Sequence, residues 1–392
     1  MKDTKAADVA RPPRIAIAHD YLTQRGGAER VVLALSRLYP DAPIYTTLYD
    51  PAGTYPEFQK LEVRTSWLNR IPVFRKHHRL AFPFLALASR SVKVEADLVI
   101  ASSSGWAHGF RTRGKKIVYC YAPARWLYEP DRYLGETAGT LARVSQRLLS
   151  PLLKRWDRRA ASSADVYLAI STVTQDRIAR TYGRESAILP APLTLPTNIP
   201  GNSGGTDRLP QEGYFLVVSR LLPYKNVRPI VEAFRSLPHQ RLLVIGSGPE
   251  QDELIRTAGK NVKFVQGLSD AEMQVAYARA AGLIAASHED FGLTPLEAAA
   301  HGVPSAVLRW GGFLDTVIEN ETGVFFDEPT PKFIVDAIER LKRRAWDPER
   351  IKARASEFGE EAFGRRLNRV VEELQTHPAS IDTGRNVSYD KP

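Results

Sequence analysis

The chain has 392 residues, of which 43% are hydrophobic and 25% are charged, and its formal net charge is +10. This length exceeds what one hydrophobic core usually organises, so it predicts two domains of a globular protein. The single cysteine, Cys120, excludes an intramolecular disulfide framework and any cluster of cysteines that would hold a metal. The basic excess predicts an acidic partner, which is nucleic acid, an anionic lipid surface or a phosphorylated substrate.

No run of about 18 apolar residues occurs in the sequence, so no transmembrane helix is expected. The charged residues 1–14 lack the apolar core of a secretory signal. With one cysteine, the chain also fits a reducing compartment. These features together predict a cytoplasmic protein.

Short apolar runs alternate with longer amphipathic stretches, which is the pattern of parallel strands covered by helices. The runs that predict strands in the first half are residues 15–19, 97–101, 117–120 and 166–170. Those in the second half are residues 214–218, 241–246, 262–265, 282–286, 304–308 and 323–326. The sequence therefore predicts an α/β protein with two doubly wound parallel-sheet domains, and a ligand is expected in the cleft between them.

Composition also sets the expected boundaries. Residues 196–210 are rich in Pro, Gly and Ser and predict a linker, and residues from Phe363 to Leu374 place apolar side chains at helical spacing. The polar ends of the chain predict disorder. The expected segments are a disordered 1–13, a first domain 14–195, a linker 196–212, a second domain 213–350, helices 351–375 that return to the first domain, and a disordered tail 376–392.

The first strand ends at His19, and Gly26 and Gly27 precede an amphipathic helix. Glycine lets a backbone approach a ligand closely, so this turn is a candidate binding loop, although ordinary turn chemistry explains paired glycines as well. The spacing is not the G-x-G-x-x-G of dinucleotide-binding folds, which argues against an NAD oxidoreductase. His19 itself is interpreted as a contact residue or as a satisfied core residue.

Two basic segments interleave cations with apolar residues. Residues 67–88 combine aromatic side chains with Arg and Lys, and residues 141–161 place leucines beside a run of cations. Basic amphipathic helices lie on anionic membrane surfaces, so one interpretation is docking on the inner leaflet of the cell membrane. The other interpretation is a buried helix with a solvated basic face. No helix-turn-helix, zinc or RNP pattern supports a nucleic-acid partner.

Candidate ligand contacts follow the predicted strand at 97–101. Trp106 and His108 stand in SSSGWAHGF, and Arg125 follows in YCYAPARWLYEPDRYL. Loops after parallel strands are where α/β sheets bind ligands. His108 as a plain structural residue remains the alternative.

The loop after the strand at 214–218 carries two cations. Ser219 ends this strand, Arg220 and Lys225 follow it, and Gly246 ends the next predicted strand. A planar guanidinium and a compact ammonium can together neutralise a departing diphosphate. An ordinary basic surface loop is the competing interpretation.

The strongest signal is SHEDFGLTPLEAAAHGVP, which follows the predicted strand at 282–286. The expected helix start at Gly292 places free backbone N–H groups and the positive end of a helix dipole beside a ligand, which favours an anion such as a diphosphate. Glu289 and Glu297 stand eight residues apart and offer acceptors for sugar and ribose hydroxyls. Alternatively, both carboxylates only cap and solvate the helix start.

These segments together resemble glycosyltransferase family 4, whose retaining enzymes have two Rossmann-like domains in the GT-B arrangement. The resemblance covers about residues 14–375 and is carried by the E-x-F-G-x(4)-E pattern at Glu289, Phe291, Gly292 and Glu297, in register with Arg220 and Lys225. The pair Gly26–Gly27 and residues 119–134 resemble the bacterial mannosyltransferase branch. RWGGFLDTVIENETGVFF at 309–326 is similar to the family's segment beside the donor.

The resemblance implies a role for each matching residue. It implies that Arg220 and Lys225 hold the diphosphate, that Glu297 holds the ribose, and that Glu289 contacts the transferred sugar. Ser219, Gly26, Gly27, Gly246 and the backbone of Phe291, Gly292, Leu293 and Thr294 would complete the donor site. No protein nucleophile and no metal cofactor are then required, and catalysis would depend on orientation and on stabilising the diphosphate.

The chain departs from the family pattern at Tyr121, where many relatives have the His of an H-x-P motif. A tyrosine can hydrogen-bond a sugar hydroxyl, but it does not carry a proton near neutral pH. The implied reaction transfers mannose from GDP-mannose to a polyprenol-diphosphate-linked or oligosaccharide acceptor in cell-surface polysaccharide synthesis. Trp106, His108 and Arg125 are the candidate contacts of this acceptor. A UDP-hexose donor is the alternative, followed by a non-transferase of the same fold such as a sugar-nucleotide epimerase.

Overall fold

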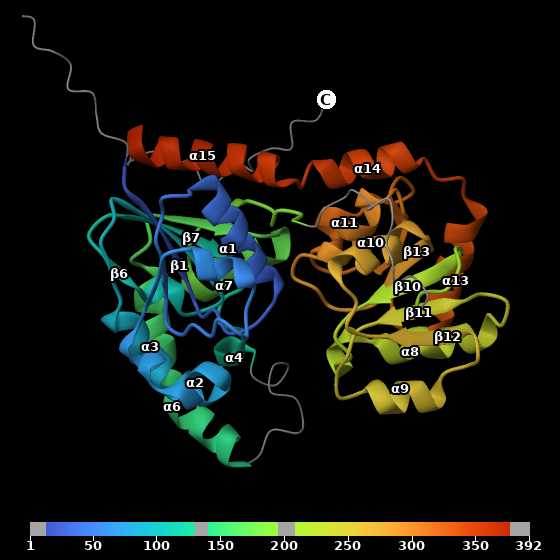
Figure 1. Cartoon of the computed structure of the whole chain (residues 1–392), viewed down its shortest axis with the longest axis horizontal. Coiled ribbons are helices and arrows are strands. Elements are labelled where there is room, and N and C mark those ends of the chain that lie inside the picture. Colours follow the sequence, from blue (N-terminus) through green and yellow to red (C-terminus); the bar gives the residue numbers. More distant parts are fainter. Residues whose placement is uncertain (1–12, 130–139, 195–207, 377–392) are drawn as a thin grey trace, which may run out of the picture. The chain divides into compact units, whose positions relative to one another are not determined.

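The computed structural model describes residues 13–129, 140–194 and 208–376, and of residues 79 and 140–148 it describes the backbone alone. The chain divides into two compact units. The first contains residues up to 168 together with 178–186, and the second contains residues 169–177 and those from 187 onward. Figure 1 colours both units along the sequence.

A seven-stranded sheet in the order β3-β2-β1-β5-β7-β8-β9 lies mainly in the first unit, and its last strand, β9, is formed by residues of the second unit. Every strand pair with an assigned register among its described residues is parallel. Its strands are β1 Ile15–His19, β2 Ile44–Thr46, β3 Val63–Thr65, β5 Leu98–Ser103, β7 Lys115–Cys120, β8 Val166–Ala169 and β9 Ala187–Ile188, and a small separate sheet pairs β4 Lys93–Val94 with β6 Arg111–Thr112. The chain order reverses between β1 and β5, which makes the carboxyl ends of these two strands the expected ligand site of the sheet.

The second unit is built on a six-stranded parallel sheet in the order β12-β11-β10-β13-β14-β15. Its strands are β10 Tyr214–Val218, β11 Leu242–Ile245, β12 Val262–Val265, β13 Ala280–Ala285, β14 Ser305–Leu308 and β15 Gly323–Phe326. Numbered within the unit, this order is 3-2-1-4-5-6, which is the Rossmann order. The reversal falls between β10 and β13, so the carboxyl ends of those strands are where this unit should bind a ligand.

Helices cover these sheets. Those before β10 in the chain are α1 Gly27–Leu38, η1 Pro56–Lys60, η2 Trp67–Arg70, α2 Pro72–Lys76, η3 His78–Ala81, α3 Phe82–Ser91, η4 Ala107–Gly109, α4 Arg125–Tyr128, α6 Thr140–Ala161 and α7 Thr172–Tyr182. Those that follow are η6 Pro223–Lys225, α8 Val227–Ala233, η7 Phe234–Ser236, α9 Gln251–Thr257, α10 Asp270–Ala278, α11 Leu293–Ala300, α12 Phe313–Thr316, α13 Pro331–Arg343, α14 Pro348–Ser356 and α15 Glu360–Thr376.

The sequence of strand β10 is apolar throughout because the strand packs against a hydrophobic core on each of its two faces. Phe215 and Val217 pack in the hydrophobic core on the side of α8 and α13. Tyr214 and Leu216 pack in a second core that also contains residues of α10 and α11. Because successive side chains of a strand point to opposite faces, a strand covered on both faces reads as a continuous apolar run.

The predicted α/β class and the two parallel sheets are confirmed, and each of the ten predicted strands overlaps a strand of the structure. The short strands β2, β3 and β9 had no sequence prediction, because two or three residues are too few to show periodicity. Most of the predicted linker and most of both predicted disordered ends lie outside the described residues, while Thr376 ends helix α15. The return of residues 351–375 to the first domain stays a prediction.

The two basic segments differ in structure. Residues 140–161 form the single helix α6, whereas residues 67–91 break into η2, α2, η3 and α3. Pro72 and Pro83 each stand in the first turn of a new helix, where the missing N–H of proline costs nothing. Across the described part of the chain, none of the helices combines the length and the apolar character that crossing a bilayer requires.

Candidate active site

The switch point of the second unit gathers the residues that the sequence selected there. Ser219 and Arg220 follow β10, and Ser287 and Glu289 follow the neighbouring strand β13. Arg220 is exposed, and its Nη2 donates to the Tyr224 hydroxyl at 3.0 Å. Its guanidinium therefore keeps most of its donors for a ligand at the strand ends.

Lys225 and Glu289 form an ion pair across this edge, with the lysine side chain 11% exposed and the glutamate 29% exposed. Glu289 Oε1 also accepts a hydrogen bond from Ser287 Oγ at 2.9 Å. Asn226, which has the left-handed φ of 51°, donates from its amide to the Ala286 carbonyl at 2.9 Å and so fixes the loop that carries Lys225. The structure thus brings these two predicted residues together, and the pair can exchange its internal contact for an anion at Lys225 and a hydroxyl at Glu289.

Helix α11 begins where the sequence placed it. Gly292 is its N-cap and has a φ of 90°, a conformation that favours glycine. Leu293 and Thr294 form its first turn, whose backbone N–H groups have no partner within a helix. Glu297, one turn further on, accepts a hydrogen bond from the Tyr277 hydroxyl, so Tyr277 is a positioning residue that the sequence did not reveal.

Three glycines at this edge are required by contacts within the protein. A Cβ at Gly246 would lie 1.8 Å from the Ser219 carbonyl oxygen, and one at Gly312 would lie 2.2 Å from Phe291 Cα. A Cβ at Gly311 would lie 2.4 Å from the Glu289 carbonyl oxygen. Gly312 also donates its N–H to that carbonyl at 3.0 Å. Residues 311–312 therefore pack closely against the backbone that carries Glu289 and Phe291.

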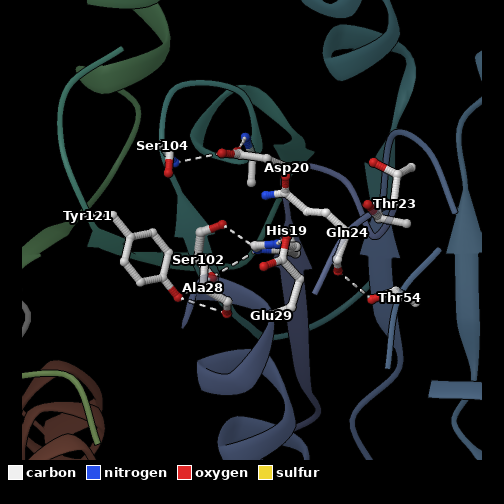
Figure 2. Close-up of polar contacts among 12 residues, drawn as sticks. His19, Asp20, Thr23, Gln24, Ala28, Glu29, Thr54, Ser102, Ser104 and Tyr121 are labelled. Carbon is white, nitrogen blue, oxygen red and sulfur yellow. Dashed lines mark hydrogen bonds and ion pairs between the residues drawn. The ribbon is translucent and has the colours of Figure 1, made fainter. Parts of the chain in front are cut away.

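The switch point of the first unit holds a chain of hydrogen bonds (Figure 2). His19 and Ser102 are register partners in β1 and β5, and His19 Nδ1 lies 3.1 Å from the Ser102 carbonyl oxygen and 3.0 Å from Ser102 Oγ. Ser102 Oγ lies 2.9 Å from the Tyr121 hydroxyl, which donates to the Ala28 carbonyl at 3.2 Å. Tyr121 thus ties the end of β7 to the first turn of α1, and burial raises its pKa well above the ordinary value, so it stays protonated.

Asp20 organises the loop after β5. This buried carboxylate accepts hydrogen bonds from the backbone N–H groups of Ser104, Trp106 and Ala107 at 2.6, 3.1 and 2.7 Å, and from Ser103 Oγ at 3.1 Å. A carboxylate that satisfies so many donors fixes the loop conformation. No sequence motif singled out Asp20, although its place directly after a predicted strand is a usable signal.

The candidate acceptor residues Trp106 and His108 lie inside the protein, each 2% exposed. Trp106 stacks on Trp126 with ring centroids 4.5 Å apart. His108 Nε2 lies 3.0 Å from Asp157 Oδ1, and its Nδ1 lies 3.1 Å from Ser103 Oγ. The expectation of direct acceptor contact is corrected for both: they hold α6 and the loop after β5 together. Arg125 opens α4 and remains partly exposed.

Across residues 13–129, 140–194 and 208–376, no group of three or more His, Cys, Asp or Glu side chains is arranged to hold a metal ion. The metal independence that the resemblance implies stays a prediction.

Comparison with known families assigns both halves of the chain. Residues 25–190 match the family described as Glycosyltransferase Family 4, and residues 206–358 match the one described as Glycosyl transferases group 1. The chain belongs to glycosyltransferase family 4. The predicted resemblance is confirmed.

Among curated relatives, a GDP-mannose-dependent alpha-(1-6)-phosphatidylinositol monomannoside mannosyltransferase of Mycolicibacterium smegmatis is 29% identical over 52% of this chain. The aligned region spans 59% of that enzyme, which is less than two thirds of its length. Human alpha-1,3/1,6-mannosyltransferase ALG2 is 26% identical, with 89% of this chain and 93% of that protein covered.

Solved structures support the GT-B fold. Anabaena Alr3699/HepE in complex with UDP aligns with a TM-score of 0.67 at 17% identity, covering 92% of this chain and 100% of that one. Sucrose-phosphate synthase of Thermosynechococcus elongatus aligns with a TM-score of 0.66 at 18% identity, covering 92% and 99%. At these identities the likeness establishes the fold alone.

Proposed function

We propose that this glycosyltransferase moves mannose from GDP-mannose, with retention of configuration, to a polyprenol-diphosphate-linked or oligosaccharide acceptor in cell-surface polysaccharide synthesis. The observation that carries the proposal is the switch point of the second unit, where Arg220, Lys225, Glu289 and the start of α11 meet. The choice of GDP-mannose is supported by the mannosyltransferases among the relatives. A UDP-hexose is the alternative donor and is kept in the test.

In this mechanism the protein supplies charge and orientation. Arg220 and Lys225 stabilise the negative charge that develops on the departing diphosphate, as do the free N–H groups at the start of α11. Lys225 must then leave its ion pair, and Glu289 becomes available to a hydroxyl of the transferred sugar. Tyr121 stays protonated and serves as a hydrogen-bonding residue that positions the first turn of α1.

Calorimetric titration without added metal tests the donor, with GDP-mannose, UDP-glucose and UDP-N-acetylglucosamine as probes. Tight binding of GDP-mannose, lost in Arg220→Ala, is the expected result. Binding of a UDP-sugar alone would replace the donor and keep the site. A failure of all three to bind would contradict the proposed site, and retained binding in Arg220→Ala would remove Arg220 from it.

We also propose that the first unit docks on the anionic inner face of the cell membrane. Apolar side chains of α2, η3, α3 and α6 are exposed, Leu87 by 61% and Leu152 by 69%. No acidic residue occurs from residue 63 to residue 94, a stretch with seven Arg and Lys. Figure 1 shows α2, α3 and α6 grouped in this unit, and Leu85 of α3 shares a core cluster with Leu153 and Trp156 of α6. Exposed leucines surrounded by cations fit a surface of anionic lipid.

Liposome flotation tests this docking. The protein is expected to float with vesicles of phosphatidylcholine and phosphatidylglycerol and to remain behind with phosphatidylcholine alone. Leu87→Glu with Leu152→Glu should abolish flotation. The matched control is Ile255→Glu, which changes a 47% exposed apolar residue of α9 in the second unit and should leave flotation intact. Equal flotation of both variants would contradict this docking surface.

A further inference from the structure

A buried acid–histidine pair stands directly behind the Gly26–Gly27 turn. His19 ends β1 and Glu29 lies in the first turn of α1, with side chains 3% and 1% exposed. His19 Nε2 is 3.9 Å from Glu29 Oε1. A charged or shared-proton pair is costly to bury and is retained where it fixes a geometry or serves a function.

The hydrogen bonds around His19 fix where its proton lies. The Ser102 carbonyl oxygen can only accept, so the contact at 3.1 Å requires a proton on His19 Nδ1. The opposite nitrogen, Nε2, then faces the Glu29 carboxylate, and a second proton there makes the ring cationic. Burial lowers the pKa of His19, but Glu29, the charge of Asp20 and the Ser102 carbonyl together raise it by more, so the net pKa lies above its ordinary value.

The first turn of α1 is consequently held at two neighbouring residues. The Glu29 side chain meets His19, and the Ala28 carbonyl accepts from Tyr121, which is linked through Ser102 to the same histidine. Figure 2 shows His19 and Ser102 between the Glu29 side chain and the Tyr121 ring. Any change in the pair therefore reaches the turn along both connections.

Glu29 also presses directly against the turn. A Cβ at Gly26 would lie 2.7 Å from Glu29 Oε2, so the carboxylate occupies the space that a side chain at position 26 would need. Among the described residues, no donor makes a hydrogen bond to this buried oxygen. A buried carboxylate oxygen without a donor is rare and calls for an explanation.

We propose that Glu29 and His19 are positioning residues for the substrate: the pair holds the Gly26–Gly27 turn in the geometry that meets the donor, and Glu29 Oε2 takes its missing hydrogen bond from the turn when the donor binds. The proposal rests on the proposed function and on the family resemblance, which implies that Gly26 and Gly27 contact the nucleotide sugar. In a capping box, a glutamate three residues after the N-cap accepts from the backbone N–H of the N-cap, which in α1 is Gly26.

The ionisable groups that face the pair are few. Asp20 follows His19 on the chain and acts on it electrostatically, and Tyr121 faces both His19 and Glu29 through Ser102 and Ala28. Because Tyr121 stays protonated, the charge of the pair changes with His19. As the pH rises through the pKa of His19, the histidine loses its positive charge and attracts Glu29 less strongly. The pair then no longer fixes the Gly26–Gly27 turn.

The test compares Glu29→Gln, His19→Gln and the double variant by donor kinetics with saturating acceptor. We expect the KM for the donor to rise about tenfold in each single variant while kcat changes less than threefold, because a misplaced binding loop weakens binding before it alters the chemistry. The double variant should be no worse than either single variant, since the residues act as one unit. The alkaline limb of the profile of kcat/KM against pH should shift to lower pH in Glu29→Gln.

Asp157→Asn is the matched control, because Asp157 faces His108 in a second buried acid–histidine pair of the same unit, with side chains 0% and 2% exposed. It should lower the melting temperature and leave the KM for the donor within twofold. A KM in Glu29→Gln that also stays within twofold would overturn the proposal, and so would independent effects that multiply in the double variant.

Amide hydrogen exchange of residues 25–30 separates this proposal from the proposed function, since it needs no substrate. Faster exchange in Glu29→Gln and in His19→Gln, but not in Asp157→Asn, supports the hold on the turn even if the wild-type protein binds none of the three nucleotide sugars. Unchanged exchange in both variants overturns it. If Glu29→Gln does not fold, His19→Gln carries both measurements.

Discussion

Replacing Gly312 with alanine tests a crowded backbone contact of the donor edge. Gly312 has φ −66° and ψ −13°, which alanine adopts without strain, so only the added methyl group matters. That Cβ would lie 2.2 Å from Phe291 Cα and 2.3 Å from the Phe291 carbonyl oxygen. Both are backbone atoms that no change of rotamer can move.

The size of the effect follows from the distance. Carbon atoms pack at about 3.5 Å or more, so residues 291 and 312 must separate by about 1 Å. Overpacking of this kind costs about 1–3 kcal/mol of folding stability. The moved segment carries Glu289 and the start of α11, and a displacement of about 1 Å in a binding site costs about 100-fold in rate.

Thermal unfolding and kcat/KM for the donor measure these two effects. Gly359→Ala is the control, because its backbone φ is ordinary and its nearest atom, Ser356 O, would be 3.3 Å from the new Cβ. We expect the control to keep its activity and Gly312→Ala to lose most of it. Wild-type stability and kcat/KM in Gly312→Ala would refute the reasoning that this glycine sets the position of the Glu289 segment.

Three further predictions follow from the described contacts. Arg220→Ala should weaken nucleotide-sugar binding by at least about tenfold in calorimetric titration, since hydrogen bonds to charged groups contribute about 1.5–3 kcal/mol, while Arg256→Ala on α9 should not. Trp106→Ala should lower the free energy of unfolding by about 3–5 kcal/mol in denaturant titration, and Trp106→Phe should keep the KM for the acceptor; a raised KM in a stable Trp106→Phe would restore the acceptor role. Burial lowers the pKa of Lys116 to about 8. Between this pH and about 10.4, the folded protein therefore binds fewer protons than the unfolded chain. The free energy of unfolding should rise with pH across that window by up to roughly 3 kcal/mol relative to Lys116→Met. Parallel stability curves for the two proteins would contradict the last prediction.

The sequence predicted the strands best where they are buried on both faces. The run Tyr214–Val218 is apolar at every position and flanked by turn residues, so its boundaries agree with those of β10. The segment at 67–88 was harder, because its apolar and basic residues suit a helix while Pro72 and Pro83 divide it. Proline acts locally, but which short helices form between prolines depends on what each can pack against.

Local sequence also placed the donor residues in one unit. Arg220 and Glu289 each follow a parallel strand, and the carboxyl ends of such strands share one edge of a sheet. The sequence could not tell that Lys225 pairs with Glu289 or that Tyr277 reaches Glu297, because these pairs join residues 64 and 20 positions apart.

By itself, the sequence determined the alternation of strands and helices, the two domains and the motif that names the family, since these depend on periodicity and on residues close in the chain. Only the tertiary structure decided which polar side chains are buried. His19 and Glu29 meet because β1 and α1 pack together, while Trp106 and His108 leave the surface because α6 covers them. Burial and pairing depend on how distant elements pack, and that information is spread over the whole chain rather than held in any one motif.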